Sequence, residues 1–406
     1  MSKNTPEIRI NGFKDSWKKY KWIDTVDIST EMVDPKSGKY DELPHVAPGN
    51  IESFTGQLYD NIKFVKDENL ISGKFHFYAG DIIYGKINPQ LGKYVFTKYE
   101  GLTSADAYVL NSKNGINQEF LYSILQTKDF YDYSVSVSKR SGMPKINREE
   151  LNAYDYMAPS EEEQKKIGEI LLGIDNQITL HQQEYEKLVN NKKAMLEKMF
   201  PKEGCDVPEI RFKGFDEPWG KCKLGDVAGY RRGSFPQPYG KSEWYDGEGA
   251  MPFVQVADVS DNMNLVESTK QKISILAQPM SVFVEKNTVL VTLQGTIGRV
   301  AITQYDAFVD RTVLIFEKYK RKIDKTFWAY IIKQKFIREA QKAPGGTIKT
   351  ITKEALSNFD LLIPEYEEQK KIGEYFAKFD ELIMNHQQEL EKLKNIKAAL
   401  LEKMFV

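Results

Sequence analysis

The chain repeats itself, and this repeat constrains its fold more than any other feature. Residues 162–200 and 367–405 align without a gap, with roughly 25 of about 40 positions identical. A second pair, PEIRINGFKDSWKKYKWID at 6–24 and PEIRFKGFDEPWGKCKLGD at 208–226, repeats with a similar offset. A period of about 200 residues excludes a solenoid, whose units have roughly 20–50 residues. The chain is therefore a pseudo-two-fold tandem duplication of one unit.

Between the repeated segments the two halves diverge. Residues 30–150 and 230–345 share little sequence. A constant frame with variable inserts is expected when the frame binds a shared partner and the inserts recognise different targets. Ordinary divergence after duplication is the alternative. It explains the pattern less well, because whole domains vary here rather than loops.

The repeated segments 162–200 and 367–405 predict two long helices. Their apolar residues alternate at steps of four and three, which is typical of a coiled-coil seam. About 33 residues at 1.5 Å each give a helix of roughly 50 Å. Because the two stripes are nearly identical, we expect the helices to pair with each other as an antiparallel coiled coil. The seam residues are Ile167, Leu171, Ile174, Ile178 and Leu188 in the first helix, and Ile372, Phe376, Phe379, Ile383 and Leu393 in the second.

Four polar residues also fall on this seam: His181, His386, Lys192 and Lys397. Two histidines alone do not provide a metal geometry. We therefore interpret all four as residues that fix register and partner choice at some cost in stability.

The start of each helix carries acidic residues. Ser160 followed by Glu163 has the spacing of a capping box. Glu163 and its repeat equivalent Glu368 are expected to be solvated charges that suit the helix dipole.

The variable parts are rich in Val, Ile and Phe with strand-like patterns. In each half a helix is expected after the strands, at 117–134 and 324–341. The predicted fold class is α+β, with two globular domains of mixed sheet and helices separated by the two long helices. The predicted boundaries are 1–158 and 204–362 for the globular domains, and 159–203 and 363–406 for the helices.

Composition excludes several classes. There are two cysteines and four histidines, none in a metal-ligand spacing, so a disulfide framework or zinc site is not expected. No apolar run of 18 residues or secretion signal is present, and a cytoplasmic protein without membrane contact is expected. The net charge of −1 gives no general basic excess. Any DNA binding must then use local basic loops, with partners supplying further phosphate contacts.

Basic, Gly-containing loops are the candidate DNA-binding elements. Arg, Lys, Asn and Gln can pair with purine edges in the major groove. The candidates are Lys86, Asn88, Gln90, Lys139, Arg140 and Lys145 in the first half, and Arg231, Arg232, Ser234, Arg299 and Lys349 in the second.

Antiparallel helices would place the two globular domains at opposite ends of a rod of roughly 50 Å. One turn of B-DNA is about 34–36 Å, the spacing at which two readers meet the same face of a duplex. The expected target is double-stranded DNA with a bipartite, interrupted site.

The junctions of domain and helix make the chain resemble a known family. The strings MPKINREELNAYDYMAPSEEEQKKIGEIL and GGTIKTITKEALSNFDLLIPEYEEQKKIGEYF look like the junctions of type I restriction-modification specificity subunits. The second string departs at Ile348, where the family usually shows Pro. The resemblance covers essentially the whole chain in the family's order of recognition domain, helix, recognition domain, helix.

The resemblance implies a non-catalytic subunit of a host-defence system. It would bind two modification (methyltransferase) subunits through the helices, and restriction/translocase subunits through the larger assembly. No cofactor is expected on this chain, while S-adenosylmethionine, ATP and magnesium would be bound by the partners.

No catalytic residues are predicted. The chain has no G-x-x-x-x-G-K-[ST] loop, and Gln90 interrupts its nearest approach to an amino-methyltransferase turn. Two alternatives stay open: a free-standing DNA enzyme with unrecognised carboxylates, and a coiled-coil scaffold without a DNA role.

Overall fold

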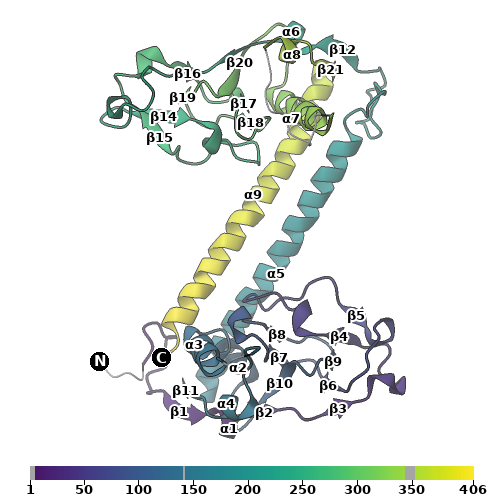
Figure 1. Cartoon of the computed structure of the whole chain (residues 1–406), viewed down its shortest axis with the longest axis vertical. Helices are drawn as coiled ribbons and strands as arrows, with labels where there is room; N and C mark the ends of the chain where they lie inside the picture. The colour runs from purple at the N-terminus through teal and green to yellow at the C-terminus, as the bar shows by residue number, and fades with distance from the viewer. Residues whose placement is uncertain (1–4, 140–141, 343–352) are drawn as a thin grey trace. The chain divides into compact units, whose positions relative to one another are not determined.

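The computed structural model describes residues 5–139, 142–342 and 353–406 (Figure 1). The chain forms two compact units. One combines Met1–Tyr185 with His386–Val406, and the other is Glu186–Asn385. This division falls part-way along each long helix. It does not test the predicted boundaries at residues 159, 204 and 363, which stay predictions.

The first unit contains a four-stranded antiparallel sheet, β2-β10-β7-β8, and a mixed five-stranded sheet, β3-β6-β9-β4-β5. A two-stranded pair, β1-β11, joins its first strand to its last. Its elements are β1 (Lys18–Lys21), α1 (Trp22–Thr25), β2 (Val26–Ile28), β3 (Met32–Val33), β4 (Pro44–Val46), β5 (Lys63–Phe64), β6 (Lys74–Phe77), β7 (Ile82–Gly85), β8 (Tyr94–Phe96), β9 (Gly101–Thr103), β10 (Ala107–Ser112), α2 (Gln118–Ile124), α3 (Lys128–Val137), α4 (Arg148–Asn152), β11 (Asp155–Ala158) and α5 (Glu161–Lys198).

The second unit repeats this plan, with four strands rather than five in its mixed sheet. Its sheets are β13-β20-β17-β18, β15-β14-β19-β16 and the pair β12-β21. The parallel contact between β14 and β19 corresponds to the one between β4 and β9. Its elements are β12 (Gly220–Lys223), α6 (Leu224–Val227), β13 (Ala228–Arg232), β14 (Met251–Val254), β15 (Gln271–Ile273), β16 (Val282–Val284), β17 (Val289–Thr292), β18 (Val300–Ile302), β19 (Ala307–Val309), β20 (Val313–Tyr319), α7 (Lys325–Lys342), α8 (Lys353–Ser357), β21 (Asp360–Ile363) and α9 (Tyr366–Lys403).

The central strands are apolar on both faces because both faces are covered. In β7, Ile82 and Tyr84 pack in the core formed with α2 and α3, whereas Ile83 packs against the second sheet. In β17, Val289 and Leu290 divide in the same way between two cores. Successive side chains of a strand point to opposite faces, so a strand covered on both sides reads as a continuous apolar run.

The helix predicted within each globular domain is confirmed in the second half of the chain only. The predicted helix at 324–341 is α7. The prediction of one helix at 117–134 is wrong, because the chain breaks between α2 and α3. Thr127 causes the break: its hydroxyl donates to the carbonyl of Ile124 (2.7 Å) and accepts from the backbone N–H of Phe130, which starts a new helix.

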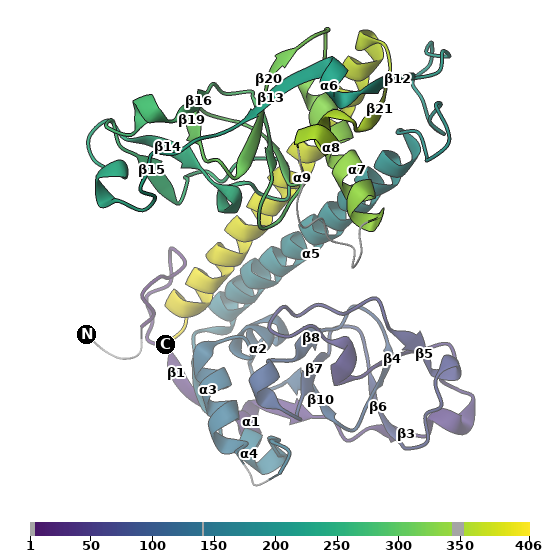
Figure 2. The same cartoon turned by 45° about the horizontal axis from the view of Figure 1, so that its top comes forward.

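The predicted antiparallel pairing of the long helices is confirmed within each unit, and α5 and α9 lie side by side in Figure 1 and Figure 2. In the first unit Leu171 and Met404 share one core. In the second, Met199 and Phe376 share another. Both helices have 38 residues, longer than expected. None of the ten predicted seam residues is exposed.

The polar seam residues form specific pairs. Lys397 contacts Asp175 (Nζ–Oδ1, 2.5 Å) in the first unit, and Lys192 contacts Asp380 in the second. The repeat relates one pair to the other. The Nδ1 atoms of His181 and His386 lie 3.0 Å apart, within hydrogen-bond distance. Sequence reasoning missed the two aspartates.

At the start of each long helix, the predicted solvated glutamate, Glu163 or Glu368, forms a buried ion pair. The prediction of a solvated charge is therefore wrong. Both carboxylate oxygens of Glu163 accept from the Arg9 guanidinium (2.8 Å each), and only 1% of the Glu163 side chain is exposed. Arg211 and Glu368 form the same bidentate pair. The Glu163 carboxylate therefore binds Arg9 rather than closing a capping box with Ser160.

The segments PEIRINGF and PEIRFKGF also bind the other end of the helix pair. The backbone N–H of Ile8 donates to the carbonyl of Lys403 (2.9 Å), and that of Ile210 donates to the carbonyl of Lys198 (2.9 Å). Each segment therefore connects the N-terminal end of one long helix to the C-terminal end of the other within its unit. The partner of Glu163 comes from a segment distant in sequence, which explains why local reasoning failed.

Gly168 allows α5 to lie directly against the start of α2. A Cβ atom on Gly168 would stand 2.7 Å from the Glu119 Cβ and from the Phe120 backbone nitrogen. Next to it, the Gln164 side chain accepts from the backbone N–H of Asn117 (3.0 Å). Gly373 and Gln369 make the equivalent contacts with the start of α7. The repeated EEQKKIG motif thus fixes each domain on its own helix.

Replacing Gly168 by alanine is expected to destabilise the first unit by about 1–3 kcal/mol, since the helix and α2 must separate. Gly173→Ala is the matched control on the same helix. No atom lies within 4 Å of a Cβ there, so the alanine is expected to stabilise the helix by roughly 0.5–1 kcal/mol. Urea unfolding of the full chain measures both. Equal effects of the two variants would contradict the close approach.

Candidate nucleic-acid interface

The structure brings two of the predicted DNA-binding loops of the first unit together. Ile87 and Lys145 form an isolated antiparallel bridge. The backbone N–H of Asn88 donates to the carbonyl of Pro144 (2.8 Å), and that of Ile146 donates to the carbonyl of Lys86 (3.0 Å). The loop after β7 and the loop before α4 therefore form one surface, although about 55 residues separate them.

This surface carries a cluster of cations, the domain-1 basic cluster, made of Lys86, Lys145 and Arg148. Lys86 Nζ and the Arg148 guanidinium lie 5.3 and 5.5 Å from the centre of the Tyr108 ring. The pKa of Lys86 is lowered, mainly by burial and further by its two basic neighbours, whereas Asp106 raises it. The cations thus oppose one another, and a bound polyanion would relieve this repulsion.

Arg148 was not among the predicted residues. Its guanidinium donates to the carbonyls of Ile28 and Ser29 (2.7 Å each), which holds it beside Tyr108. Its position three residues after Lys145 is the feature of the sequence that could have identified it as a candidate.

Asn88 and Gln90 lie on a loop of fixed shape. Asn88 has a positive φ of 51°, and Gln90 donates to its side-chain oxygen (3.3 Å). Tyr131 donates to the carbonyl of Gln90 (3.4 Å). Gly92 closes the loop against Phe54, whose ring would lie 2.4 Å from a Cβ at this position. The exposed Gln90 is thus presented from a rigid support.

The other candidates of the first unit are less informative. Lys139 is exposed just after the end of α3. Arg140 lies outside the described residues, as does Lys349 in the second half.

In the second unit, several predicted residues are bound within the domain. Arg299 contacts Asp261 (Nε–Oδ1, 2.7 Å), and Arg231 contacts Glu317 (3.6 Å). The Ser234 hydroxyl donates to the carbonyl of Met280 (3.1 Å). Arg232 is exposed on β13. The structure therefore does not assemble these residues into a counterpart of the domain-1 basic cluster.

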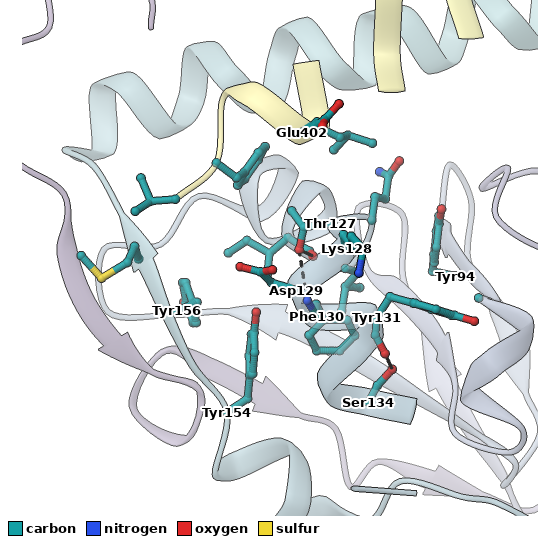
Figure 3. A pocket seen from close by; sticks show the side chains of 18 of the residues that line it. Tyr94, Thr127, Lys128, Asp129, Phe130, Tyr131, Ser134, Tyr154, Tyr156 and Glu402 are labelled. Carbon is teal, nitrogen blue, oxygen red and sulfur yellow. Dashed lines mark hydrogen bonds between the residues drawn. The ribbon is translucent and has the colours of Figure 1, made fainter. Parts of the chain in front are cut away.

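A cavity of about 800 Å³ also opens in the first unit, among α3, β11 and the end of α9 (Figure 3). Tyr94, Phe130, Tyr154 and Tyr156 are among the residues that line it. Its lining is mainly apolar, and its two lysines are each paired with an aspartate, Lys19 with Asp155 (2.8 Å) and Lys128 with Asp132. The domain-1 basic cluster, rather than this cavity, is therefore the surface suited to phosphates.

Among the described residues, no group of three or more His, Cys, Asp or Glu side chains is placed to hold a metal ion. Within that same part of the chain, every helix is too short or too polar to cross a membrane.

The sequence and fold match known proteins. Residues 15–190 and 216–395 match the family described as "Type I restriction modification DNA specificity domain", and the chain belongs to this family. It is 32% identical over 180 residues to the "Type I restriction enzyme EcoDI specificity subunit" of Escherichia coli, covering 44% of this chain and 38% of that one. It is 24% identical to the "Putative type I restriction enzyme MjaX specificity subunit" of Methanocaldococcus jannaschii, covering 98% and 95%.

One solved structure has the same fold over nearly the whole chain. The type I restriction-modification S subunit from M. genitalium superposes with a TM-score of 0.69 at 15% identity, covering 99% of both chains. At this identity the likeness concerns the fold. It agrees with the α+β class, the tandem duplication and the paired helices.

Proposed function

We propose that this chain selects the DNA sequence for a type I restriction-modification complex, each globular domain reading one half of a bipartite site. The observation that carries the proposal is the duplicated architecture. The same arrangement of sheets, apart from the additional strand β3 in the first unit, and the same buried helix contacts occur twice, while the loops at the candidate interface differ in sequence. Two domains that share a fold but differ in their loops can recognise the two different halves of a bipartite DNA site.

The chain's own part is recognition. Its candidate interface offers cations, amides and aromatic rings, which bind phosphates and base edges. Membership of the specificity-domain family supports a non-catalytic subunit. The proposed partners are two modification subunits bound on the helices, and restriction/translocase subunits in the larger assembly. S-adenosylmethionine, ATP and magnesium would act in those partners.

Sequencing the methylated bases of the host genome with and without this gene tests the proposal. We expect one bipartite methylation motif to disappear when the gene is deleted and to return when it is restored. An unchanged set of motifs in a host with active modification subunits would contradict the proposal.

Replacing Lys86 and Lys145 by alanine is expected to weaken DNA binding by the assembled complex. If each lysine contacts one phosphate, the slope of log K against log salt should fall by about one per residue. Lys128→Ala is the matched control, because this exposed lysine is paired with Asp132 beside the cavity. Titrations at several salt concentrations measure the slope. Equal slopes for the double variant and the control would show that DNA does not contact Lys86 and Lys145.

A further inference from the structure

The turn between β19 and β20 of the second unit is equivalent to the turn between β9 and β10 of the first unit. That turn of the first unit borders the domain-1 basic cluster. In the first unit, the backbone N–H of Lys86 donates to the carbonyl of Asp106 (3.0 Å). In the second, the N–H of Leu293 donates to the carbonyl of Thr312 in the same way (2.8 Å). The two turns follow equivalent strands, β9 and β19. Residues on the turn at Asp310–Thr312 therefore lie at the equivalent surface.

Asp310 holds this turn in one shape. Its side chain is buried, with 2% exposed, and one oxygen accepts from the backbone N–H (3.0 Å) and the hydroxyl (2.5 Å) of Thr312. Its backbone N–H donates to Val254 (3.0 Å). Its second oxygen is buried and meets no donor among the described residues. The buried carboxylate thus fixes the base of the turn while its neighbour Arg311 projects outward.

Arg311 belongs to a group of three side chains that the sequence did not predict. Its guanidinium carbon lies 5.5 Å from the centre of the Tyr239 ring. The Gln255 amide donates to the Tyr239 hydroxyl (3.0 Å). Tyr239 is 46% exposed, and Arg311 is exposed. Three separate segments of the chain thus present an arginine, an amide and an aromatic ring together.

This group is free to bind, whereas two of the predicted arginines are not. Arg299 and Arg231 are held by carboxylates of their own domain. Arg311 makes no ion pair with any described residue, so its donor fork is open to a ligand. Gln255 uses one amide hydrogen for Tyr239, which leaves its carbonyl oxygen and its other N–H for a ligand.

We propose that Gln255 and Arg311 determine the base specificity of the second domain, with Tyr239 as the residue that positions them. The guanidinium fork matches O6 and N7 of guanine, and the Gln255 amide matches N6 and N7 of adenine, both in the major groove. The contact of the Arg311 guanidinium with the Tyr239 ring and the hydrogen bond from Gln255 to the Tyr239 hydroxyl hold both side chains in place before DNA binds. This assignment rests on the proposed function and names the residues that carry it out in one half of the chain.

The test measures methylation by the full chain assembled with its modification subunits. The substrates are DNA duplexes in which each position of both half-sites is varied. Arg311→Ala and Gln255→Ala are each expected to lose roughly 5- to 150-fold of the discrimination at one position of the half-site read by the second domain. The other half-site stays unchanged. Arg311→Lys keeps the charge but not the fork, so it should lose the discrimination at guanine as well.

Tyr239→Phe separates positioning from a structural role. It removes the bond to Gln255 but keeps the ring beside Arg311, so discrimination should fall at the adenine position alone. Unchanged discrimination in Gln255→Ala and Arg311→Ala, in a complex whose wild type is sequence-specific, would overturn the assignment. So would a uniform loss at all sequences in Arg311→Ala that Arg311→Lys restores, which marks a phosphate contact. A wild-type complex without any sequence preference would instead overturn the proposed function.

Discussion

Arg9→Met is expected to destabilise the first unit by about 3–5 kcal/mol. The variant leaves the Glu163 carboxylate buried without its bidentate partner, and breaking a buried ion pair from one side has about this cost. The loss should be local, because Arg9 and Glu163 belong to the same unit. Hydrogen exchange of the full chain, resolved by peptide, measures it as lower protection at the start of α5.

Two further variants are controls for this prediction. Arg211→Met should produce the same loss at the start of α9 and leave the start of α5 protected, because it breaks the equivalent pair of the second unit. The double change Arg9→Met with Glu163→Met removes both charges, and should recover most of the stability. A loss below about 1 kcal/mol in Arg9→Met would show that the pair contributes no more than a surface ion pair.

Lys397→Met should cost the first unit a similar amount, about 3–5 kcal/mol near neutral pH. Only 12% of the Asp175 side chain is exposed, and Lys397 supplies its opposite charge. Burial already raises the pKa of Asp175 above its ordinary value of 3.8, against the effect of Lys397. Without the lysine this pKa should rise further.

The sign of the pH effect follows from this shift. A carboxyl group whose pKa is higher in the folded than in the unfolded chain binds more protons when folded. The folded Lys397→Met variant should therefore gain stability as the pH falls through the raised pKa towards 3.8, relative to a variant that cannot titrate. Asp175→Asn with Lys397→Met is that variant. Urea unfolding between neutral and mildly acid pH compares them, and parallel pH profiles would contradict the prediction.

The sequence predicted the framework because the framework depends on local patterns that occur twice. The alternating apolar steps from Ile167 and from Ile372 predicted both long helices, and their near identity predicted that they pair. The α+β class followed from the strand-like runs. The break at Thr127 was missed, because one hydroxyl that caps a helix changes the chain direction without altering the apolar pattern.

The buried charges were missed for a different reason. Glu163 is an ordinary first-turn acid until Arg9, 154 residues away, covers it. Asp175 and Asp380 lie off the apolar stripe, and their lysine partners come from the other helix. The repeat did contain a sign, since Arg9 and Glu163 both recur, as Arg211 and Glu368, in the two pairs of repeated segments.

The candidate interface was predicted in part. Lys86, Asn88 and Lys145 meet because two loops pair across the end of a sheet, and their basic composition was visible in the sequence. Gln255 and Arg311 are single residues on turns without any basic run. Only the three-dimensional fold brings them to Tyr239.

In the proposed function, each domain reads one half of the DNA site independently. This independence is tested by replacing residues 1–158 by the first recognition domain of another family member and sequencing the methylated bases of the host genome. We expect one half of the bipartite motif to change to that of the donor and the other half to stay the same. A motif that remains wholly unchanged, or changes in both halves, would contradict it.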